Sequence, residues 1–490
     1  GGSGFFGSVG ITGEFISAVG DLTNATANIE VDARDKIISP GFINIHSHTN
    51  AGIVNKPGLS CIFQGITTEL GGQCGSSQGP DSNGNNVGFH LYEMSNQNLG
   101  YNFATMVGHG TIRRLVLGSE DITPTAEDLQ KMRNYTDEAV RQGAFGLSTG
   151  LEYIPGSLAK TPELIELAKA LEPFGVPYAS HMRNEDNFLL DAIDETLTVG
   201  KEAGCPVQIS HLKVQGQPNW KNIDQVFEKI EKASGERGNV HFDRYPYVAY
   251  STGLSNLFPN WSREGGSRRF VERLNDSSLE GRIKEYVTGK VNDLGSWNSV
   301  MVSSARSQED RQYVGKRMDE IAADKGTDPF EETISMLLRN NGSVGMVGFG
   351  MSEENTERIL AHPLGMICSD GSAMSAETGG SPHPRNFGAF ARAVGYYCRD
   401  QKIFDLPTVV HKMTQMPAEK LQFKKRGLLQ RDYYADISVF DFDTIKDTAT
   451  FQDPKKYAAG VSHVLVNGKI TVSNGEHTGE LPGKVLRFEP

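Results

Sequence analysis

The sequence has few cysteines and no long apolar run. Its 490 residues include five cysteines, an odd number scattered along the chain, so we predict no disulfide framework and favour a reducing compartment. No apolar run approaches the roughly 18 to 20 residues of a membrane-spanning helix, so we predict no membrane span. The first ten residues contain neither the basic segment nor the apolar core of a signal peptide. We therefore expect a cytoplasmic protein; the alternative is a signal peptide that was removed together with a missing native N-terminus.

An excess of positive charge is also absent. Lysine and arginine number 48 and aspartate and glutamate 60, which gives a net charge of −12. This balance argues against a nucleic-acid groove or an anionic membrane surface as the main partner. A few local cations are still enough to bind a small anion, so we expect a small-molecule partner. The oligomeric state stays open.

Short apolar runs recur along the chain, and each ends in polar or glycine-rich residues. Helical patterns separate them, for example 124–142, 161–175 and 187–204. Eight such strand–helix units predict an α/β protein built on a (β/α)8 barrel. The eight runs cover residues 36–48, 65–74, 102–110, 143–150, 176–183, 206–213, 240–247 and 362–371.

Two features depart from a plain barrel. A polar, charged segment at about 260–345 lies in the long interval before the eighth run, and we expect it to form a lid or subdomain. Strand-like material also flanks the barrel at both ends. We therefore predict a barrel over 39–425 and a small β-sandwich domain formed jointly by residues 1–38 and 426–490.

Metal-binding residue types gather at the ends of the predicted strands, where a barrel of this class has its active site. His46 and His48 lie two residues apart, so both imidazoles can point to the same side of the first strand. A single histidine at a strand end is more often structural than a ligand, but the combination supplies the N, S and O donors that zinc prefers. We therefore predict a metal centre at the barrel mouth. The other residues at these ends are Cys74, His109, Ser148, His181, His211, Asp243, Tyr245 and Asp370.

At these residues the chain resembles a known family, the N-acyl-D-amino-acid deacylases (D-aminoacylases) of the amidohydrolase superfamily. The resemblance covers nearly the whole chain. It is most specific where a strand-2 cysteine combines with "GLSTGLEY", "SHLK" and "PHPR". The other matching stretches include "PGFINIHSHTN", "QGITTELGGQCG", "MVGHGTIR", "SHMRNED", "DRYPYVAYSTGL" and "CSDG".

The resemblance implies zinc held firmly by Cys74, His181 and His211. His46, His48 and Asp370 then complete the site, either as ligands of a second, weaker metal or as residues that hold the water. Related hydantoinases carry a carboxylated lysine at the end of strand 4, whereas this chain has "GLSTG" there. The resemblance therefore implies that the cysteine takes the bridging role, with one firm zinc and occasional second occupancy.

The implied reaction is zinc-dependent hydrolysis of N-acyl-D-amino acids to a carboxylate and a free D-amino acid. Asp370 is expected to be the catalytic base that accepts the proton of the water and passes it to the leaving amine. Cationic and hydroxyl side chains are expected to bind the substrate carboxylate; these are Lys213, Tyr153, Tyr245, Ser251 and Arg385. His109 is expected near the site without binding metal, and Arg183 serves either the site or a structural ion pair.

Two other functions are weighed against this one. The first is a hydantoinase or dihydroorotase-like hydrolase of cyclic amides, against which the missing strand-4 lysine and the strand-2 cysteine both argue. The second is a non-catalytic assembly protein with the amidohydrolase fold; such proteins usually lose ligands, and here every expected ligand is present.

Overall fold

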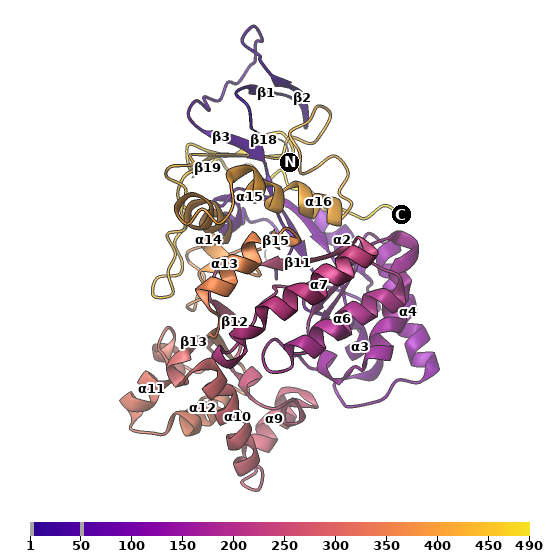
Figure 1. Ribbon diagram of the computed structural model, residues 1–490, viewed down its shortest axis with the longest axis vertical. Coiled ribbons are helices and arrows are strands. Elements are labelled where there is room, and N and C mark those ends of the chain that lie inside the picture. The colour runs from indigo at the N-terminus through magenta and orange to yellow at the C-terminus, as the bar shows by residue number, and fades with distance from the viewer. Residues whose placement is uncertain (1–3, 50–52) are drawn as a thin grey trace.

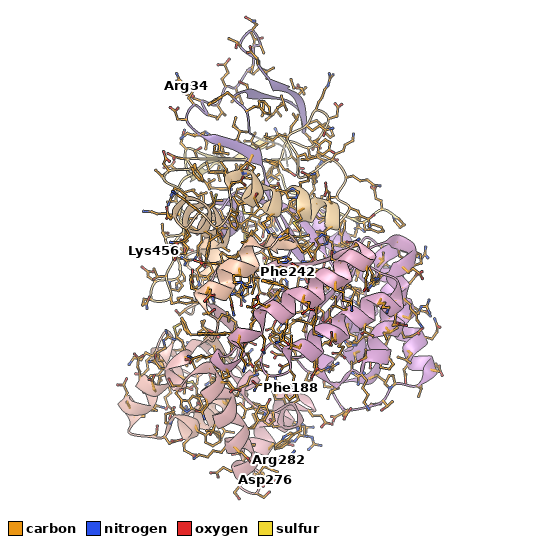
Figure 2. All side chains as sticks on the ribbon, viewed as in Figure 1. Arg34, Phe188, Phe242, Asp276, Arg282 and Lys456 are labelled. Atoms are coloured by element: carbon orange, nitrogen blue, oxygen red, sulfur yellow. The ribbon has the colours of Figure 1, made fainter. Side chains whose placement is uncertain are left out.

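The computed structural model describes residues 4–49 and 53–490. Three parts follow one another along its long axis (Figure 1). A small β-domain lies at the top of the view, a barrel in the middle and a helical insertion at the bottom. Side chains fill the space between the parts, and Phe242 of the barrel is buried against residues of the surrounding helices, among them Val226 and Ile359 (Figure 2). No helix in the described part of the chain is long and apolar enough to cross a membrane.

Parallel strands form the predicted (β/α)8 barrel, and each of the eight predicted runs contains at least one of them; the run 102–110 contains two, β6 and β7. Six pair in the order β15-β11-β10-β9-β8-β7, and three in the order β4-β5-β6. The chain runs from β6 directly into β7, which joins the two sheets at one side. At the other side Asn44 Nδ2 donates to Ser369 Oγ at 2.7 Å, which brings β4 against β15. The strands are β4 (Phe42–Asn44), β5 (Ile66–Gly71), β6 (Asn102–Thr105), β7 (Val107–Gly108), β8 (Leu147–Gly150), β9 (Tyr178–His181), β10 (Val207–Ile209), β11 (Val240–Arg244) and β15 (Gly365–Ile367).

The helices around the barrel begin and end at local signals in the sequence. Thr125 and Asp128 form a capping box at the start of α4. Pro162 lies in the first turn of α5, and Gly204 ends α6 with a φ of +69°. These helices are α1 (Leu59–Ile62), α2 (Val87–Ser95), α3 (His109–Leu117), α4 (Ala126–Arg141), α5 (Thr161–Ala168), α6 (Leu189–Ala203), α7 (Ile223–Arg237), α13 (Glu353–Ala361), α14 (Arg385–Arg392), α15 (Leu406–Met413) and α16 (Gln415–Lys420).

Segments from both ends of the chain form the β-domain. Its main sheet is antiparallel in the order β19-β18-β17-β16-β3, and a hairpin of β1 and β2 packs against it through Ile16, which clusters with Ile437 and Leu465. The predicted boundary after residue 38 falls within β3, so the run 36–48 serves both parts. The strands are β1 (Ser8–Thr12), β2 (Phe15–Gly20), β3 (Ile37–Pro40), β16 (Ile437–Phe440), β17 (Val461–Val466), β18 (Lys469–Ser473) and β19 (Glu476–His477).

The insertion has its own antiparallel sheet, in the order β12-β14-β13. Its first strand begins at Ala249, before the predicted start near residue 260. Lys290 pairs with Asp186 of the barrel, and Asn187 Nδ2 donates to Asp293 Oδ2 at 2.7 Å, so the insertion is docked on the loop after β9. Its elements are β12 (Ala249–Gly253), α8 (Asn260–Arg263), α9 (Gly266–Leu274), α10 (Glu280–Leu294), β13 (Val300–Ala305), α11 (Met318–Lys325), α12 (Pro329–Arg339) and β14 (Val344–Phe349).

Candidate metal centre

The six predicted ligands converge at the carboxyl ends of the barrel strands. Three of them have a positive φ, which is uncommon for residues other than glycine and persists only where the surroundings hold it. These angles are +51° at Cys74, +38° at His211 and +48° at Asp370. Sharp turns at the strand ends thus aim these side chains into the mouth of the barrel.

The loop after β5 shows how such a turn is held. Ser148 Oγ donates to the Gly72 carbonyl oxygen at 2.5 Å and accepts from the Gly75 amide at 3.1 Å. Gln73 Nε2 donates to the Ile45 carbonyl oxygen at 3.0 Å. Gly72 has a φ of +71°, and a Cβ there would lie 2.1 Å from the Met106 carbonyl oxygen, so only glycine fits. Hydrogen bonds to two neighbouring strand ends, at Ser148 and Ile45, therefore hold the turn that carries Cys74.

One group of possible ligands consists of Cys74, His181 and His211. Cys74 Sγ lies 3.6 Å from His181 Nδ1 and 3.5 Å from His211 Nε2, and the two nitrogens are 2.8 Å apart. Zinc bonds of about 2.0–2.3 Å in a tetrahedron place ligand atoms roughly 3.3–3.7 Å apart. The sulfur–nitrogen distances fit a zinc ion, and the nitrogen–nitrogen distance is shorter than that range.

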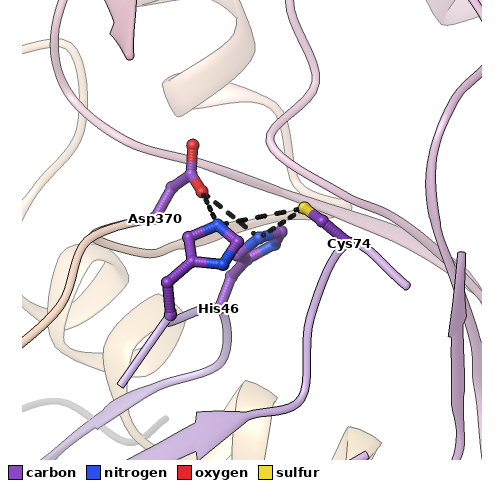
Figure 3. A group of neighbouring side chains, drawn as sticks. His46, Cys74 and Asp370 are labelled. Carbon is purple, nitrogen blue, oxygen red and sulfur yellow. Dashed lines mark hydrogen bonds and ion pairs between the residues drawn. The ribbon is translucent and has the colours of Figure 1, made fainter. Parts of the chain in front are cut away.

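A second group consists of His46, His48, Cys74 and Asp370; Figure 3 shows Cys74 and Asp370 on either side of His46. Cys74 Sγ lies 3.4 Å from His46 Nε2 and 3.9 Å from His48 Nε2. Asp370 Oδ1 lies 3.3 Å from His46 Nε2 and 2.8 Å from His48 Nε2. Because Cys74 belongs to both groups, its thiolate would be available as a ligand to a metal ion held by either group.

Neighbouring charges favour the anionic forms of Cys74 and Asp370. Burial by itself raises the pKa of the Cys74 thiol, but the charges of His46 and His211 lower it well below its usual range. Burial also raises the pKa of Asp370, but the Arg385 guanidinium lowers it well below its usual range. A thiolate and a carboxylate are the forms that bind zinc.

In each of the three buried histidines of these two groups, a carboxylate lies against the ring nitrogen that faces away from the other ligands. This arrangement orients metal-binding imidazoles. His211 Nδ1 lies 3.1 Å from Glu185 Oε1, and His46 Nδ1 lies 3.2 Å from Asp243 Oδ1. His181 Nε2 lies 3.4 Å from Glu152 Oε2. Burial raises the pKa of Glu152, but the hydrogen bond from His181 and the charge of Lys290 lower it to about 2.

Sequence reasoning missed Glu152 and Glu185. Glu152 lies in "GLEYIPG" beside the predicted Tyr153, and Glu185 lies in "HMRNED" four residues after His181. Both stretches were singled out for other residues. Each glutamate could therefore have been suspected because it lies in a motif that already supplied a site residue. The histidine that each carboxylate contacts becomes visible only in the folded barrel.

A cavity of about 30 Å³ adjoins the metal-binding groups. Four of the five predicted substrate-binding residues line it: Tyr153, Lys213, Tyr245 and Ser251. The insertion contributes Tyr250, Thr252 and Asn256 to the same wall. Tyr250 and Thr252 flank the predicted Ser251 in "DRYPYVAYSTGL", whereas Asn256 had no signal in the sequence. The insertion thus forms part of the cavity wall.

Arg385, the fifth residue predicted to bind substrate, lies behind Asp370. Its Nη1 is 2.5 Å from Asp370 Oδ2, and its guanidinium lies 4.7 Å from the centre of the Tyr245 ring. It is not among the residues that line the cavity. Direct binding of substrate by Arg385 therefore stays a prediction, and its observed contact is with the predicted base.

Two further residues near the strand ends, His109 and Arg183, have carboxylate partners outside the cavity. His109 Nε2 lies 2.8 Å from Glu163 Oε1, in a buried group with Arg113. Arg183 makes two bonds of 2.9 Å to the carboxylate of Glu195. Neither residue lines the cavity. The contacts of Arg183 therefore favour a structural ion pair over a role in the site.

A (β/α)8 barrel with a His-x-His pair on its first strand, a flanking β-domain and metal-binding residues at its mouth defines the class of amidohydrolases. The model of the "Amidohydrolase family" matches residues 378–472. Among curated proteins, the chain is 34% identical to a D-aminoacylase of Alcaligenes xylosoxydans xylosoxydans, over 98% of this chain and 93% of that protein. It is 32% identical to an N-acyl-D-glutamate deacylase of the same organism, over 98% of this chain and 92% of that protein.

Solved structures agree with the curated relatives. The chain superposes on a D-aminoacylase described with a binuclear metal centre, with a TM-score of 0.83, 32% identity and coverage of 99% and 96%. An N-acyl-D-glutamate deacylase of Bordetella bronchiseptica, complexed with zinc and a phosphonate inhibitor, superposes with a TM-score of 0.83 and 30% identity. That match covers 98% of this chain and 95% of the other. A D-hydantoinase from Thermus is 15% identical with a TM-score of 0.57 and shares the fold alone. The chain belongs to the N-acyl-D-amino-acid deacylase family of the amidohydrolases.

Proposed function

We propose that the protein is a zinc-dependent hydrolase that cleaves N-acyl-D-amino acids into a carboxylate and a free D-amino acid. The observation that carries this proposal is that Cys74 belongs to two groups of possible metal ligands, next to a cavity with Lys213, Tyr245 and Ser251 in its wall. Relatives over the whole chain that are named for N-acyl-D-amino-acid deacylation support it.

The donor set fits zinc. Cys74, His181 and His211 would hold the firm ion, and His46, His48 and Asp370 would hold a second, weaker one with the shared thiolate. The superposed D-aminoacylase is described with one-metal activation and second-metal attenuation, in line with this division. When bound, zinc lowers the pKa of a coordinated water toward about 7 and polarises the amide carbonyl.

Asp370 is the proposed base. Arg385 keeps its carboxylate ionised, so it can accept a proton from the attacking water and pass it to the nitrogen of the leaving amine. The water oxygen joins the acyl carbon, the carbon–nitrogen bond breaks, and the products are a carboxylate and an amine. Asp370 ends the cycle without its extra proton.

Lys213, Tyr245 and Ser251 are proposed to bind the α-carboxylate of the amino acid. Glu185 Oε1 lies 2.6 Å from Lys213 Nζ and holds the ammonium at the cavity wall. The Tyr245 hydroxyl is buried and has no hydrogen-bond partner among the described residues. A buried donor without a partner costs about 1–3 kcal/mol, so a substrate oxygen that accepts from Tyr245 binds favourably.

Glu152 supports a finer proposal on the substrate side chain. Its carboxylate lines the cavity, accepts from Asn256 Nδ2 at 3.0 Å, and makes no direct ion pair with lysine or arginine in the described part of the chain, although the charge of Lys290 acts on it. We therefore expect uncharged or cationic side chains to be preferred over those of D-glutamate and D-aspartate, because like charges repel in a buried site.

The alternatives have less support. Hydantoinases share only the fold with this chain, and β8 ends in Ser148-Thr149-Gly150 without a lysine. A non-catalytic assembly role does not need a thiolate, three buried imidazoles and a carboxylate at one point of the barrel.

Parallel assays of the zinc-loaded protein test the proposal. N-acetyl-D-methionine should be hydrolysed, N-acetyl-L-methionine and hydantoin should not, and N-acetyl-D-glutamate should react more slowly than the methionine derivative. Turnover of hydantoin with none of the linear substrates would show that the reaction class is wrong. Hydrolysis with D-glutamate preferred would overturn only the role given to Glu152.

A further inference from the structure

A second cavity adjoins the metal-binding groups on the side away from the insertion. It has a volume of about 130 Å³, against about 30 Å³ for the first cavity, and His48 lines both. The loop that carries Cys74 forms part of its wall through Gly72 and Gln73. The proposed function so far leaves this cavity unassigned.

The walls of the second cavity differ in polarity. Polar residues come mainly from the loop after β5, among them Ser76 and Ser77, and also include Thr49, His90 of α2 and Thr105 of β6. Apolar side chains come from one face of α2, with Val87, Leu91 and Met94, and from Phe103 of β6. All four apolar residues are at least 96% buried. A ligand that passes His48 therefore meets polar groups and, on the side of α2 and Phe103, an apolar wall.

The two cavities lie on opposite sides of the metal-binding residues. Lys213, Tyr245 and Ser251 lie after β10, after β11 and in β12, whereas the second cavity is built from β5, α2 and β6. The scissile amide joins an amino acid to an acyl group. When the α-carboxylate lies against Lys213 and the carbonyl lies at the metal-binding groups, the acyl group points past His48 into the second cavity.

We propose that the second cavity is the acyl-group subsite and that it selects acyl chains longer than acetyl. This inference rests on the proposed function. The size of the cavity supports it, because a space of about 10–15 Å³ on this measure already holds one water, and 130 Å³ is far more than a methyl group fills. Each further methylene that leaves water contributes about fourfold in binding.

A substrate series measures the effect directly. The N-acetyl, N-butanoyl and N-hexanoyl derivatives of D-methionine are compared with the zinc-loaded protein by kcat/KM. We expect the hexanoyl derivative to exceed the acetyl derivative by about tenfold or more, mainly through a lower KM. Hexanoate should also inhibit competitively at a lower concentration than acetate. Equal values along the series would overturn the inference.

Two variants tie the chain-length effect to the cavity. Leu91→Phe fills part of the space and should remove most of the advantage of the hexanoyl substrate over the acetyl substrate. Leu91→Ala enlarges the space and should move the optimum to longer chains. Leu164→Phe in α5 is the matched control, because Leu164 is equally buried but lines neither cavity.

Zinc content and Tm are measured for all three variants, so that a folding defect is recognised. If Leu91→Phe unfolds, the enlarged Leu91→Ala variant decides the case: an unchanged chain-length optimum overturns the inference. Failure of the proposed function gives a different result, namely no hydrolysis of any N-acyl-D-methionine by wild-type protein. Hydrolysis of the whole series with identical selectivity in Leu91→Phe, Leu164→Phe and wild type rejects the acyl subsite alone.

Discussion

At the scale of single residues, the Cys74 sulfur lies within 4 Å of four imidazole nitrogens, at distances of 3.4–3.9 Å. A free thiol in a core is normally a small apolar group. The four nitrogens around Cys74 and the lowered pKa of its thiol are instead typical of a thiolate that binds metal. The other four cysteines are buried, and burial raises the pKa of Cys205 to about 11.

Replacing Cys74 should therefore remove zinc and activity together. In Cys74→Ala we expect less than about a tenth of a zinc per chain and loss of nearly all turnover, because the shared ligand is gone. Metal analysis and an assay with N-acetyl-D-methionine measure this. Cys205→Ala is the control and should keep both. A Cys74→Ala protein that retains full zinc would show that the sulfur is not a ligand.

Replacing Asp370 should separate metal binding from turnover. In Asp370→Asn we expect turnover to fall by about 10²–10⁴-fold with most of the firmly bound zinc retained, because the proton acceptor is lost while Cys74, His181 and His211 stay. The matched control is Asp310→Asn, which removes a buried carboxylate paired with Arg339 at 2.7 Å in the insertion. Both variants lose stability, but only the first should lose turnover. Near-normal turnover of Asp370→Asn would contradict its role as base.

At the scale of elements, a buried ionic group joins α3 to α5. Glu163 of α5 accepts from His109 at 2.8 Å and pairs with Arg113, and all three side chains are at most 4% exposed. Removing one partner of such a pair leaves an uncompensated buried charge. Burial raises the pKa of Glu163, but the hydrogen bond from His109 and the charge of Arg113 bring it below its ordinary 4.5.

Glu163→Gln should therefore lower the free energy of unfolding by about 3–5 kcal/mol at pH 7. Because the folded-state pKa is lowered, the stabilisation is complete above pH 4.5 and is lost as the pH falls through the folded-state value. The difference between wild type and variant should accordingly shrink below pH 4.5. Urea titrations at pH 7, 5 and 3.5 measure it, with Glu166→Gln, a partly exposed pair on the same helix, as a control expected to cost less than about 1 kcal/mol. A difference that grows in acid would contradict this account.

At the scale of the whole molecule, the active-site cavity is completed by a part that supplies no metal ligand. The insertion contributes Tyr250, Ser251 and Asn256 to the wall, while all six expected ligands come from barrel strand ends. Lys290 of α10 pairs with Asp186 of the barrel. The position of the insertion therefore sets substrate binding more than metal binding.

Lys290→Ala should raise KM by about tenfold while zinc content stays the same and kcat changes less, because the docking of the insertion on the barrel is weakened. Steady-state kinetics with N-acetyl-D-methionine and metal analysis check this. Lys284→Ala, in the same helix with an exposed partner at 3.2 Å, should stay within about twofold of wild type. Loss of zinc in Lys290→Ala would show that docking of the insertion is also needed for metal binding.

Most of the architecture was predictable because it follows from local patterns. Apolar runs with polar ends predict strands, and capping residues such as Thr125 predict helix starts, without knowledge of any distant contact. The predicted boundary between β-domain and barrel falls within β3, because β3 and β4 form one apolar run in the sequence. Gly41 separates them, and a Cβ there would lie 2.2 Å from Thr67 Oγ1, a contact that the local sequence does not contain.

The sequence by itself determined the barrel and the residue types at its strand ends, because strand period and donor chemistry are local properties. Only the tertiary structure decided that Cys74 lies between both ligand groups, that Glu152 and Glu185 lie against His181 and His211, and that Arg385 pairs with Asp370. It also decided that a second cavity opens beside His48. These contacts join residues far apart in the chain, and their distances are set by the closure of the barrel and the sharp turns at its rim.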